Sequence, residues 1–131
     1  MADQSKTITF ELEGILFEYD EEKNRINQAK HGISFEHAAR VFFDYNRIEM
    51  YDEENSVEED RYDTIGDVSF GFTNAIGNIA PANVSGGEIL FVVYTERIRR
   101  AENARQIDVT RIISARYATN FERGLYYGKH D

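Results

Sequence analysis

The stretch Ile89-Leu90-Phe91-Val92-Val93-Tyr94 decides the fold class of this chain. It is the strongest strand signal in the sequence, and it is apolar at every position. A strand with two apolar faces lies inside a sheet, because an edge or half-exposed strand alternates with polar residues. We therefore expect the chain to fold around a sheet with this strand near its centre.

Weaker strand signals lie on both sides of this run. Residues 7–12 alternate polar and apolar side chains, and residues 15–19 follow after Gly14 as a hairpin partner. Further strands are expected at 47–51, 61–65, 68–72 and 107–113, with a turn or bulge at Gly66. The intervening segments are an acidic loop at 52–60, a Gly- and Asn-rich loop at 74–87 and a charged connector at 97–105.

Capping residues predict two helices after the first hairpin. Asp20 is a good N-cap for a helix over 21–30, and Gly32 suits the left-handed position that follows its end. Ser34 begins a second helix, whose apolar residues recur at helical spacing. These apolar residues are Phe35, Ala38, Ala39 and Phe42.

A last helix is expected from Ser114 to about Tyr126. Its polar face would carry Arg116, Asn120, Arg123 and Tyr127, and its apolar face Tyr117, Phe121 and Leu125, which we assign to the core. The predicted fold is α+β: an antiparallel sheet with two N-terminal helices and one C-terminal helix packed on it. The whole chain, residues 1–131, is expected to form one domain, with 1–14 as an N-terminal extension that forms a strand and 15–127 as the main body.

Charge is distributed unevenly along the 131 residues. The net charge is −9, and the chain has no cysteine. Residues 1–96 hold 7 Lys and Arg against 20 Asp and Glu, whereas residues 97–131 hold 8 against 4. The acidic body argues against a general nucleic-acid binder, and the basic end suggests a local anion site. No segment has the apolar length of a signal peptide or a membrane span, so a cytoplasmic protein is expected.

The basic end offers a candidate phosphate site. The segment Arg111-Ile112-Ile113-Ser114-Ala115-Arg116 is interpreted as a strand that ends where a helix starts. A helix N-terminus presents free N–H groups, and arginine adds a planar fork of donors that matches phosphate oxygens. Arg97 closes the central strand and Arg61 opens an earlier one, so these arginines would converge if their strand ends meet.

The first helix carries a second group of candidates. Lys23, Asn27 and Lys30 share one helical face, and His31 extends it, as a ribose-phosphate contact would require. The alternative is a solvated face on which His31 only binds the last carbonyl groups. A metal site formed by Glu58, Glu59 and Asp60 is a weaker alternative, because their spacing matches no metal-binding loop; neither a metal nor another cofactor is expected.

Five motifs of the chain carry a resemblance to a known protein family. They are Phe17-Glu18-Tyr19-Asp20-Glu21-Glu22-Lys23, Asn27-Gln28-Ala29-Lys30-His31-Gly32-Ile33-Ser34-Phe35, Glu59-Asp60-Arg61-Tyr62, Val92-Val93-Tyr94-Thr95-Glu96-Arg97 and Arg111-Ile112-Ile113-Ser114-Ala115-Arg116. With these motifs the chain resembles, over roughly residues 15–127, the BrnT family of bacterial toxins, the ribonuclease half of a type II toxin–antitoxin pair. The resemblance implies a RelE-like fold, RNA cleavage and a cognate BrnA-type ribbon-helix-helix antitoxin, through which alone the pair would bind operator DNA.

Metal-free RNA cleavage by the ribose 2′-OH needs cations for the phosphorane, a base and an acid. We predict that Arg97, Arg111 and Arg116 stabilise the phosphate and that His31 transfers protons, because histidine titrates near ~6.5. Glu59 is the fallback base. The supporting residues are Arg61, Lys23, Asn27, Lys30 and Arg123. The alternative function is a weak or inactive RelE-like module that only pairs with an antitoxin, its arginines holding the partner's carboxylates.

Overall fold

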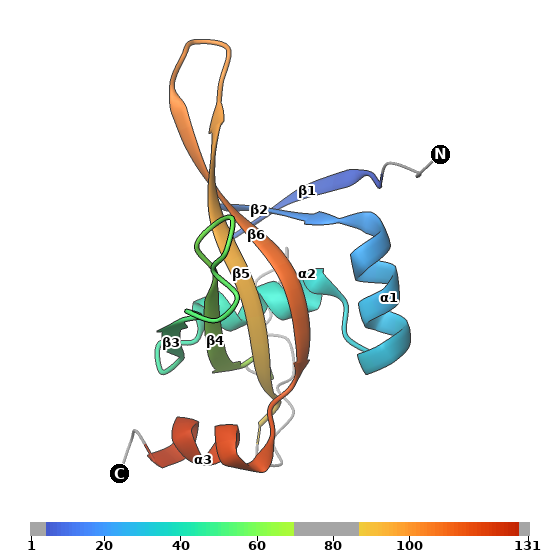
Figure 1. Ribbon diagram of the computed structural model, residues 1–131, viewed down its shortest axis with the longest axis vertical. Coiled ribbons are helices and arrows are strands. Elements are labelled where there is room, and N and C mark those ends of the chain that lie inside the picture. The colour runs from blue at the N-terminus through green and yellow to red at the C-terminus, as the bar shows by residue number, and fades with distance from the viewer. Residues whose placement is uncertain (1–4, 70–86, 129–131) are drawn as a thin grey trace, which may run out of the picture.

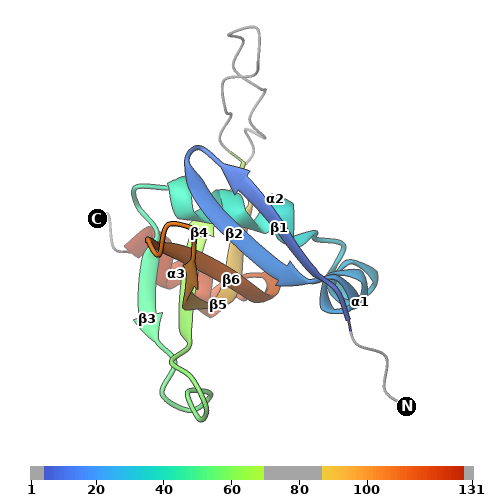
Figure 2. The same cartoon turned by 90° about the horizontal axis from the view of Figure 1, so that it is seen from above.

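The computed structural model describes residues 5–69 and 87–128. Its strands form one sheet, and short helices pack on this sheet (Figure 1 and Figure 2). The predicted α+β class is confirmed. In chain order the elements are β1 (Thr7–Leu12), β2 (Ile15–Asp20), α1 (Glu21–His31), α2 (Phe35–Ala38), the 3-10 helix η1 (Ala39–Phe43), β3 (Ile48–Tyr51), β4 (Tyr62–Asp67), β5 (Ile89–Arg100), β6 (Gln106–Tyr117) and α3 (Asn120–Gly128).

The six strands form one sheet in the order β1-β2-β6-β5-β4-β3. All neighbouring pairs are antiparallel except β2 and β6, which run parallel. The apolar run 89–94 lies in β5, inside the sheet, as predicted. β5 then continues to Arg100, and β6 begins at Gln106, so the connector expected at 97–105 is wrong in its first part: residues 97–100 are strand, and only residues 101–105 join the two strands. The resulting hairpin extends beyond the rest of the sheet (Figure 1).

The predicted hairpin and helix caps at the N-terminal side are confirmed. β1 and β2 pair antiparallel, and the Asp20 carboxylate accepts a hydrogen bond from the Lys23 N–H at 2.9 Å. Gly32 has a φ of 73° at the end of α1, a conformation that glycine adopts without steric cost. The Ser34 hydroxyl caps α2 by accepting from the His37 N–H at 3.0 Å. Local signals therefore fix this part of the chain.

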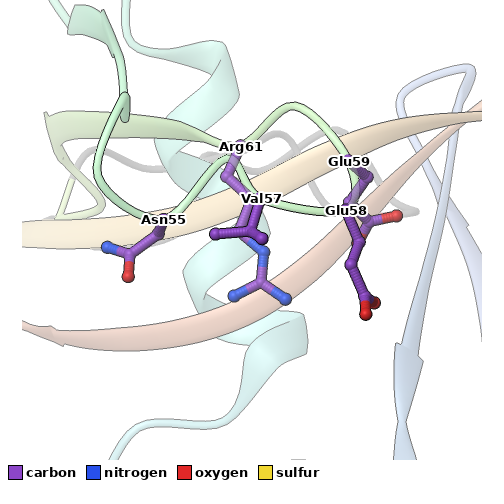
Figure 3. A pocket seen from close by; sticks show the side chains of 5 residues that line it. All are labelled: Asn55, Val57, Glu58, Glu59 and Arg61. Atoms are coloured by element: carbon purple, nitrogen blue, oxygen red, sulfur yellow. The ribbon is translucent and has the colours of Figure 1, made fainter.

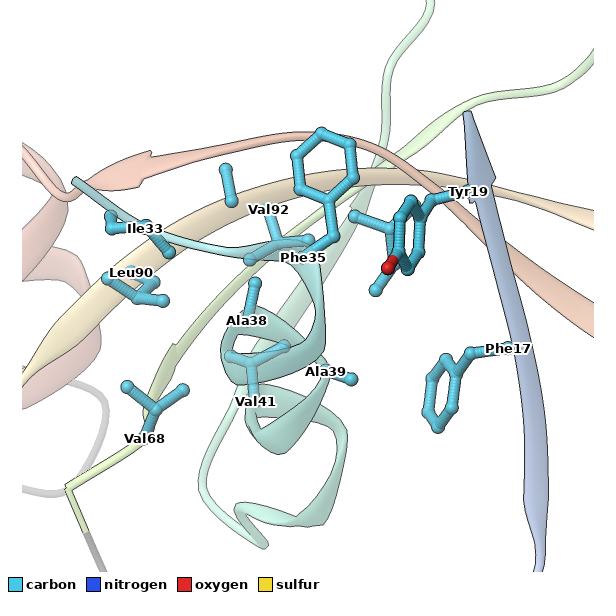
Figure 4. Packing of buried hydrophobic residues seen from close by; sticks show 12 residues of the cluster. Phe17, Tyr19, Ile33, Phe35, Ala38, Ala39, Val41, Val68, Leu90 and Val92 are labelled. Carbon is cyan, nitrogen blue, oxygen red and sulfur yellow. The ribbon is translucent and has the colours of Figure 1, made fainter. Parts of the chain in front are cut away.

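The main core lies between one face of the sheet and the helices α2 and η1. Phe17 of β2, Phe35 of α2 and Val92 of β5 are fully buried there. Figure 4 shows the small side chains of the helix facing the strands, with the aromatic rings of β2 beside them. A smaller cluster contains Ile89 of β5 and Tyr126 of α3. Because side chains alternate along a strand, β5 supplies opposite faces to the two clusters.

The expected helix start at Ser114 is wrong. Ser114 is a strand residue that pairs with Val93, and the strand runs on to Tyr117. The last helix begins at Asn120 instead. The Glu122 N–H donates to the Thr119 hydroxyl at 3.2 Å, and the Thr119 N–H donates to the Glu122 carboxylate at 2.8 Å. This reciprocal pair is a capping box, and Thr-x-x-Glu was its signal in the sequence.

The later start changes which side chains of α3 are buried. Tyr117 lies in β6, and Phe121 and Leu125 are 75% and 41% exposed, so assigning these three to the core is wrong. Arg116 also lies in β6 and shares no helical face with Arg123. The buried residue of α3 is Tyr126, whose hydroxyl donates to a carboxylate oxygen of Asp44 at 2.6 Å.

The turn or bulge expected at Gly66 is also wrong. Gly66 lies within β4 and pairs with Leu90. A Cβ at this position would lie 2.5 Å from Val41 Cγ2 of η1, so glycine lets the strand and the 3-10 helix approach closely. Of the strand expected at 68–72, residues 68–69 follow β4, and residues 70–72 lie outside the described part of the chain. Nearly all of the loop expected at 74–87 also lies outside it.

Candidate functional site

Three arginines converge on one buried carboxylate. Glu18 of β2 contacts Arg111 of β6 at 2.7 Å, Arg99 of β5 at 3.2 Å and Arg97 of β5 at 3.8 Å. The Glu18 side chain is only 10% exposed, whereas those of Arg97 and Arg99 are 43% and 46% exposed. The carboxylate therefore lies beneath guanidinium groups that reach the surface.

Strand pairing explains this convergence. Glu18 and Arg111 are direct partners in the parallel pairing of β2 with β6. Arg111 is also opposite Thr95 in the antiparallel pairing of β5 with β6. Arg97 and Arg99 follow Thr95 at intervals of two, which is the period that keeps side chains on one face of a strand. The sheet thus brings together residues that are 93 positions apart in the sequence.

The cluster keeps an excess of positive charge. Glu18 neutralises one of the three guanidinium groups, and Glu59 adds a second carboxylate by accepting from Arg97 at 3.1 and 3.2 Å. Each guanidinium has five N–H donors, so these contacts leave donors unused. Like charges this close repel one another unless an anion balances them. The arrangement therefore suits an added phosphate or carboxylate.

A cavity of about 230 Å³ lies between α1 and the edge of β6. Its lining places the candidate residues of α1 next to Ser114, where the sequence predicted a junction between a strand and a helix. At the start of α1, burial raises the pKa of Asp20, but hydrogen bonds from Ser5 and Lys23 and the charge of Arg111 together bring it below its usual range. The residues that line the cavity are Lys23, Ile26, Asn27, Lys30, His31, Ile113 and Ser114.

Asn27 has a structural position within this group. It is 7% exposed, and its amide donates to the carbonyl oxygens of Ile33 at 3.0 Å and Ala115 at 2.8 Å. Its side-chain oxygen accepts from the Ala115 N–H at 3.2 Å. Both amide N–H groups are thus engaged with the backbone. The expected polar stripe therefore reduces to Lys23 and Lys30, with His31 at its end.

Arg116 lies on the same sheet face as Arg111, although the two residues are an odd number of positions apart in the strand. A β-bulge makes this possible, because Val93 pairs with Ser114 while Tyr94 pairs with Ile112. Arg116 lies over the Phe91 ring at 4.2 Å and forms a two-pronged ion pair with Glu122 at 2.7 and 3.0 Å. The hydrogen bonds from Arg116 lower the pKa of the Glu122 carboxyl despite its burial.

Asp63 of β4 is a titratable group that the sequence analysis did not identify. Burial, a hydrogen bond with Asp52 and the negative charge of Asp52 raise the pKa of Asp63 to about 7. Arg116 opposes the shift, and Glu122 adds to it. Asp63 is opposite Val93, which is itself opposite Ser114, so the three strands place this carboxyl in the row between the two arginines of β6.

The acidic loop holds Arg61 apart from the Glu18 cluster. A cavity of about 320 Å³ is lined by Asn55, Val57, Glu58, Glu59 and Arg61. Figure 3 shows the arginine and both glutamates extending from the loop. Glu59 connects this cavity to the Glu18 cluster, because its carboxylate also forms an ion pair with Arg97. Within residues 5–69 and 87–128, no three His, Asp or Glu side chains are grouped so that they could hold a metal ion.

Arg123 lies on α3 over the Tyr127 ring at 5.8 Å, so these two residues share a helical face as expected, whereas Arg116 lies in β6. One further residue differs from the expectations. Arg99 joins the cluster, although the sequence analysis placed it in a connector. The alternation Arg97-x-Arg99 was the signal for a continuing strand, and the many charges around it concealed that signal.

A comparison with known families covers those site residues that come from the N-terminal part of the chain. Residues 19–74 match the family described as the ribonuclease toxin, BrnT, of type II toxin–antitoxin systems. The BrnT resemblance is confirmed. The BrnT match includes Lys23, Lys30 and His31 of the cavity and Glu59 and Arg61 of the loop, whereas the arginines of β5 and β6 lie beyond it. No curated protein matches the chain. No helix in the described residues is long and apolar enough to cross a membrane.

Proposed function

We propose that this chain is the toxin of a type II toxin–antitoxin pair and cleaves RNA without a metal ion, by attack of the ribose 2′-OH on the neighbouring phosphate. The observation that supports this best is the convergence of Arg97, Arg99 and Arg111 above the buried Glu18 carboxylate. The match of residues 19–74 to a family of ribonuclease toxins supports the same reaction class.

The proposed chemistry divides between the cluster and the adjoining cavity. Arg97, Arg99 and Arg111 hold the scissile phosphate and stabilise the charge of the phosphorane, since fixed cations act most strongly where charge develops. His31 transfers the protons, and Lys23 and Lys30 hold the flanking backbone. The helix α1, which carries Lys23, Lys30 and His31, and the strand β5 both contact β6. One RNA strand would therefore cross from the cavity to the cluster.

The remaining candidates take supporting places in this proposal. Glu59 is the alternative base, because it contacts Arg97 directly at the rim of the cluster. Arg116 assists from the next part of the same sheet face, where Glu122 orients its guanidinium. Arg61 contributes charge from the acidic loop. Arg123 keeps its predicted role as a contact for the RNA beyond the scissile bond.

The proposal includes a cognate BrnA-type ribbon-helix-helix antitoxin, contact with operator DNA only through that antitoxin, a RelE-like arrangement in one domain, and a cytoplasmic location. One observation favours the second candidate function, a protein-binding module: Arg97, Arg99, Arg111 and Arg116 each already bind a carboxylate. Acidic side chains of a partner would fit the same donors, and an antitoxin would then cover the site that it blocks.

RNA cleavage in EDTA tests the proposal. Purified protein should produce fragments that end in a cyclic phosphate, and Arg111→Ala should cut about 10²–10³-fold more slowly because a charge donor to the transition state is lost. The matched control is Arg25→Ala, since Arg25 makes an exposed ion pair with Glu22 away from the cluster.

Three results would contradict the assignment. Parent-rate cleavage by a folded Arg111→Ala protein would exclude the arginine cluster as the active site. Activity that needs added Mg²⁺ or Mn²⁺ would contradict cleavage without a metal ion. An absence of cleavage together with tight binding to the product of the neighbouring gene would favour the protein-binding module.

A further inference from the structure

Glu18 belongs to the site, although it was not among the candidate residues predicted from the sequence. We propose that Glu18 is a positioning residue, whose buried carboxylate orients Arg97, Arg99 and Arg111 so that their remaining N–H groups face a single phosphate. This inference rests on the proposed function for its ligand, because it assumes that the cluster receives the phosphate of an RNA backbone.

Burial places Glu18 beneath the site and not within it. Its side chain is 10% exposed, compared with 43% for Arg97 and 46% for Arg99. Both of its oxygens are occupied: Oε1 accepts from Arg99, and Oε2 contacts Arg97 and accepts from Arg111. A carboxylate held from above by three guanidinium groups has no free path to a 2′-OH. Its role is therefore to act through the arginines.

The strands give Glu18 a fixed position. It lies between Phe17 and Tyr19, which are anchored in the main core, and it is the direct partner of Arg111 in the sheet. Arg97 and Arg99 come from the part of β5 that extends past its pairing with β4, which ends at Tyr94. Without Glu18, Arg99 would lose the carboxylate that orients it, and Arg97 would keep only its hydrogen bonds to Glu59, so flexible side chains would set more of the direction of both guanidinium groups.

A competing interpretation makes Glu18 an obstacle to the ligand. In that case the carboxylate occupies the arginines and competes with phosphate for them. The two interpretations predict opposite signs. Neutralising Glu18 adds one positive charge to the cluster, which by itself strengthens anion binding. Loss of orientation weakens anion binding, because a set of donors that is already oriented loses less conformational entropy when the anion binds.

A titration with inorganic phosphate shows whether replacing Glu18 weakens or strengthens anion binding. The signals of the arginine side chains would be followed by ¹H–¹⁵N NMR during a phosphate titration of the full chain at constant ionic strength. In the parent protein, Arg97, Arg99 and Arg111 should shift together along one binding curve. Glu18→Gln should bind phosphate at least about 10-fold more weakly despite its extra positive charge. Glu22→Gln is the matched control, because its ion pair with Arg25 is exposed, and it should bind like the parent.

A second variant covers the case in which Glu18→Gln does not fold. Glu18→Asp keeps the charge but withdraws the carboxylate by one methylene, so it should also bind phosphate more weakly, by about 3-fold or more. Parent-like or tighter binding by either folded variant would overturn the positioning role. An absence of phosphate binding to the parent protein would overturn it as well.

RNA cleavage separates this inference from the proposed function. Replacing a positioning residue should lower kcat by about 10²-fold, raise KM by no more than the measured loss of phosphate affinity, and preserve the shape of the pH–rate profile. If the parent protein binds phosphate through the cluster but does not cut RNA, the nuclease proposal fails and the positioning role stands. If the parent cuts RNA and a folded Glu18→Gln protein cuts it equally fast, the positioning role fails and the nuclease proposal stands.

Discussion

Replacing Asp63 by asparagine should make the protein more stable near neutral pH. The pKa of Asp63 is raised from 3.8 to about 7 by burial, by its hydrogen bond with Asp52 and by the charge of Asp52. A raised carboxyl pKa means that folding favours the protonated form. The resulting stability is fully present below the ordinary pKa of 3.8 and is lost as the pH rises through about 7.

The magnitude follows from the size of this shift. A change from 3.8 to about 7 corresponds to an upper limit of roughly 4 kcal/mol between the two ends of the pH range. Asp63 is only partly buried, so solvent screening reduces the expected loss to about 2 kcal/mol. Asparagine keeps an N–H donor for Asp52 and has no charge to bury, so this loss should be absent from the variant.

Urea unfolding at a series of pH values from 4 to 8 measures the effect. The free energy of unfolding of Asp63→Asn minus that of the parent should grow by about 2 kcal/mol across this range, because the other carboxyl groups titrate in both proteins. A flat difference for Asp63→Asn would refute the assignment of a raised pKa to this carboxyl.

Two further substitutions test the packing that holds the site. Asn27→Ala should lower the free energy of unfolding by about 2–3 kcal/mol, because it leaves the buried N–H and C=O of Ala115 without these partners; parent-like urea unfolding would contradict this. Gly66→Ala should lower it by about 1–3 kcal/mol through the clash of the new Cβ with Val41, and an unchanged thermal midpoint would show that η1 yields without cost.

The sequence predicted well those elements whose signals are local. Asp20, Gly32 and Ser34 each act on their own helix within three or four residues, and the hairpin of β1 and β2 needs only a short turn. The apolar run of β5 likewise requires an interior position. These features depend on neighbours in the chain, so a single sequence contains what is needed to predict them.

The segment around Ser114 shows what local signals could not provide. Ser114 is a good helix cap, but pairing with β5 keeps it in a strand, and strand pairing depends on a segment some 20 residues away. Thr119 and Glu122 held the better cap, because only they satisfy each other reciprocally. Because a serine next to an apolar strand resembles a helix cap, the sequence predicted the start of the last helix about six residues too early.

The composition of the site was predictable only in part. The sequence identified Arg97 and Arg111 as members of an anion site, and both lie in the observed cluster. It did not identify Glu18, since a single glutamate in an alternating strand resembles any solvent-facing residue. Its role depends on the parallel pairing of β2 with β6, which joins parts of the chain that are far apart.

The amide of Asn27 has a consequence for how the protein behaves among other chains. β2 pairs with β6 only from Thr110 to Ile112, which leaves the following backbone of β6 at a sheet border. Asn27 bonds to Ala115 there as a peptide group of one more strand would, so α1 seals the border with a single side chain. A foreign strand that extends the sheet would therefore join at β1 or β3, or at the outer part of the β5–β6 hairpin beyond Tyr94, and any engineered protection against fibre growth should be placed at these edges.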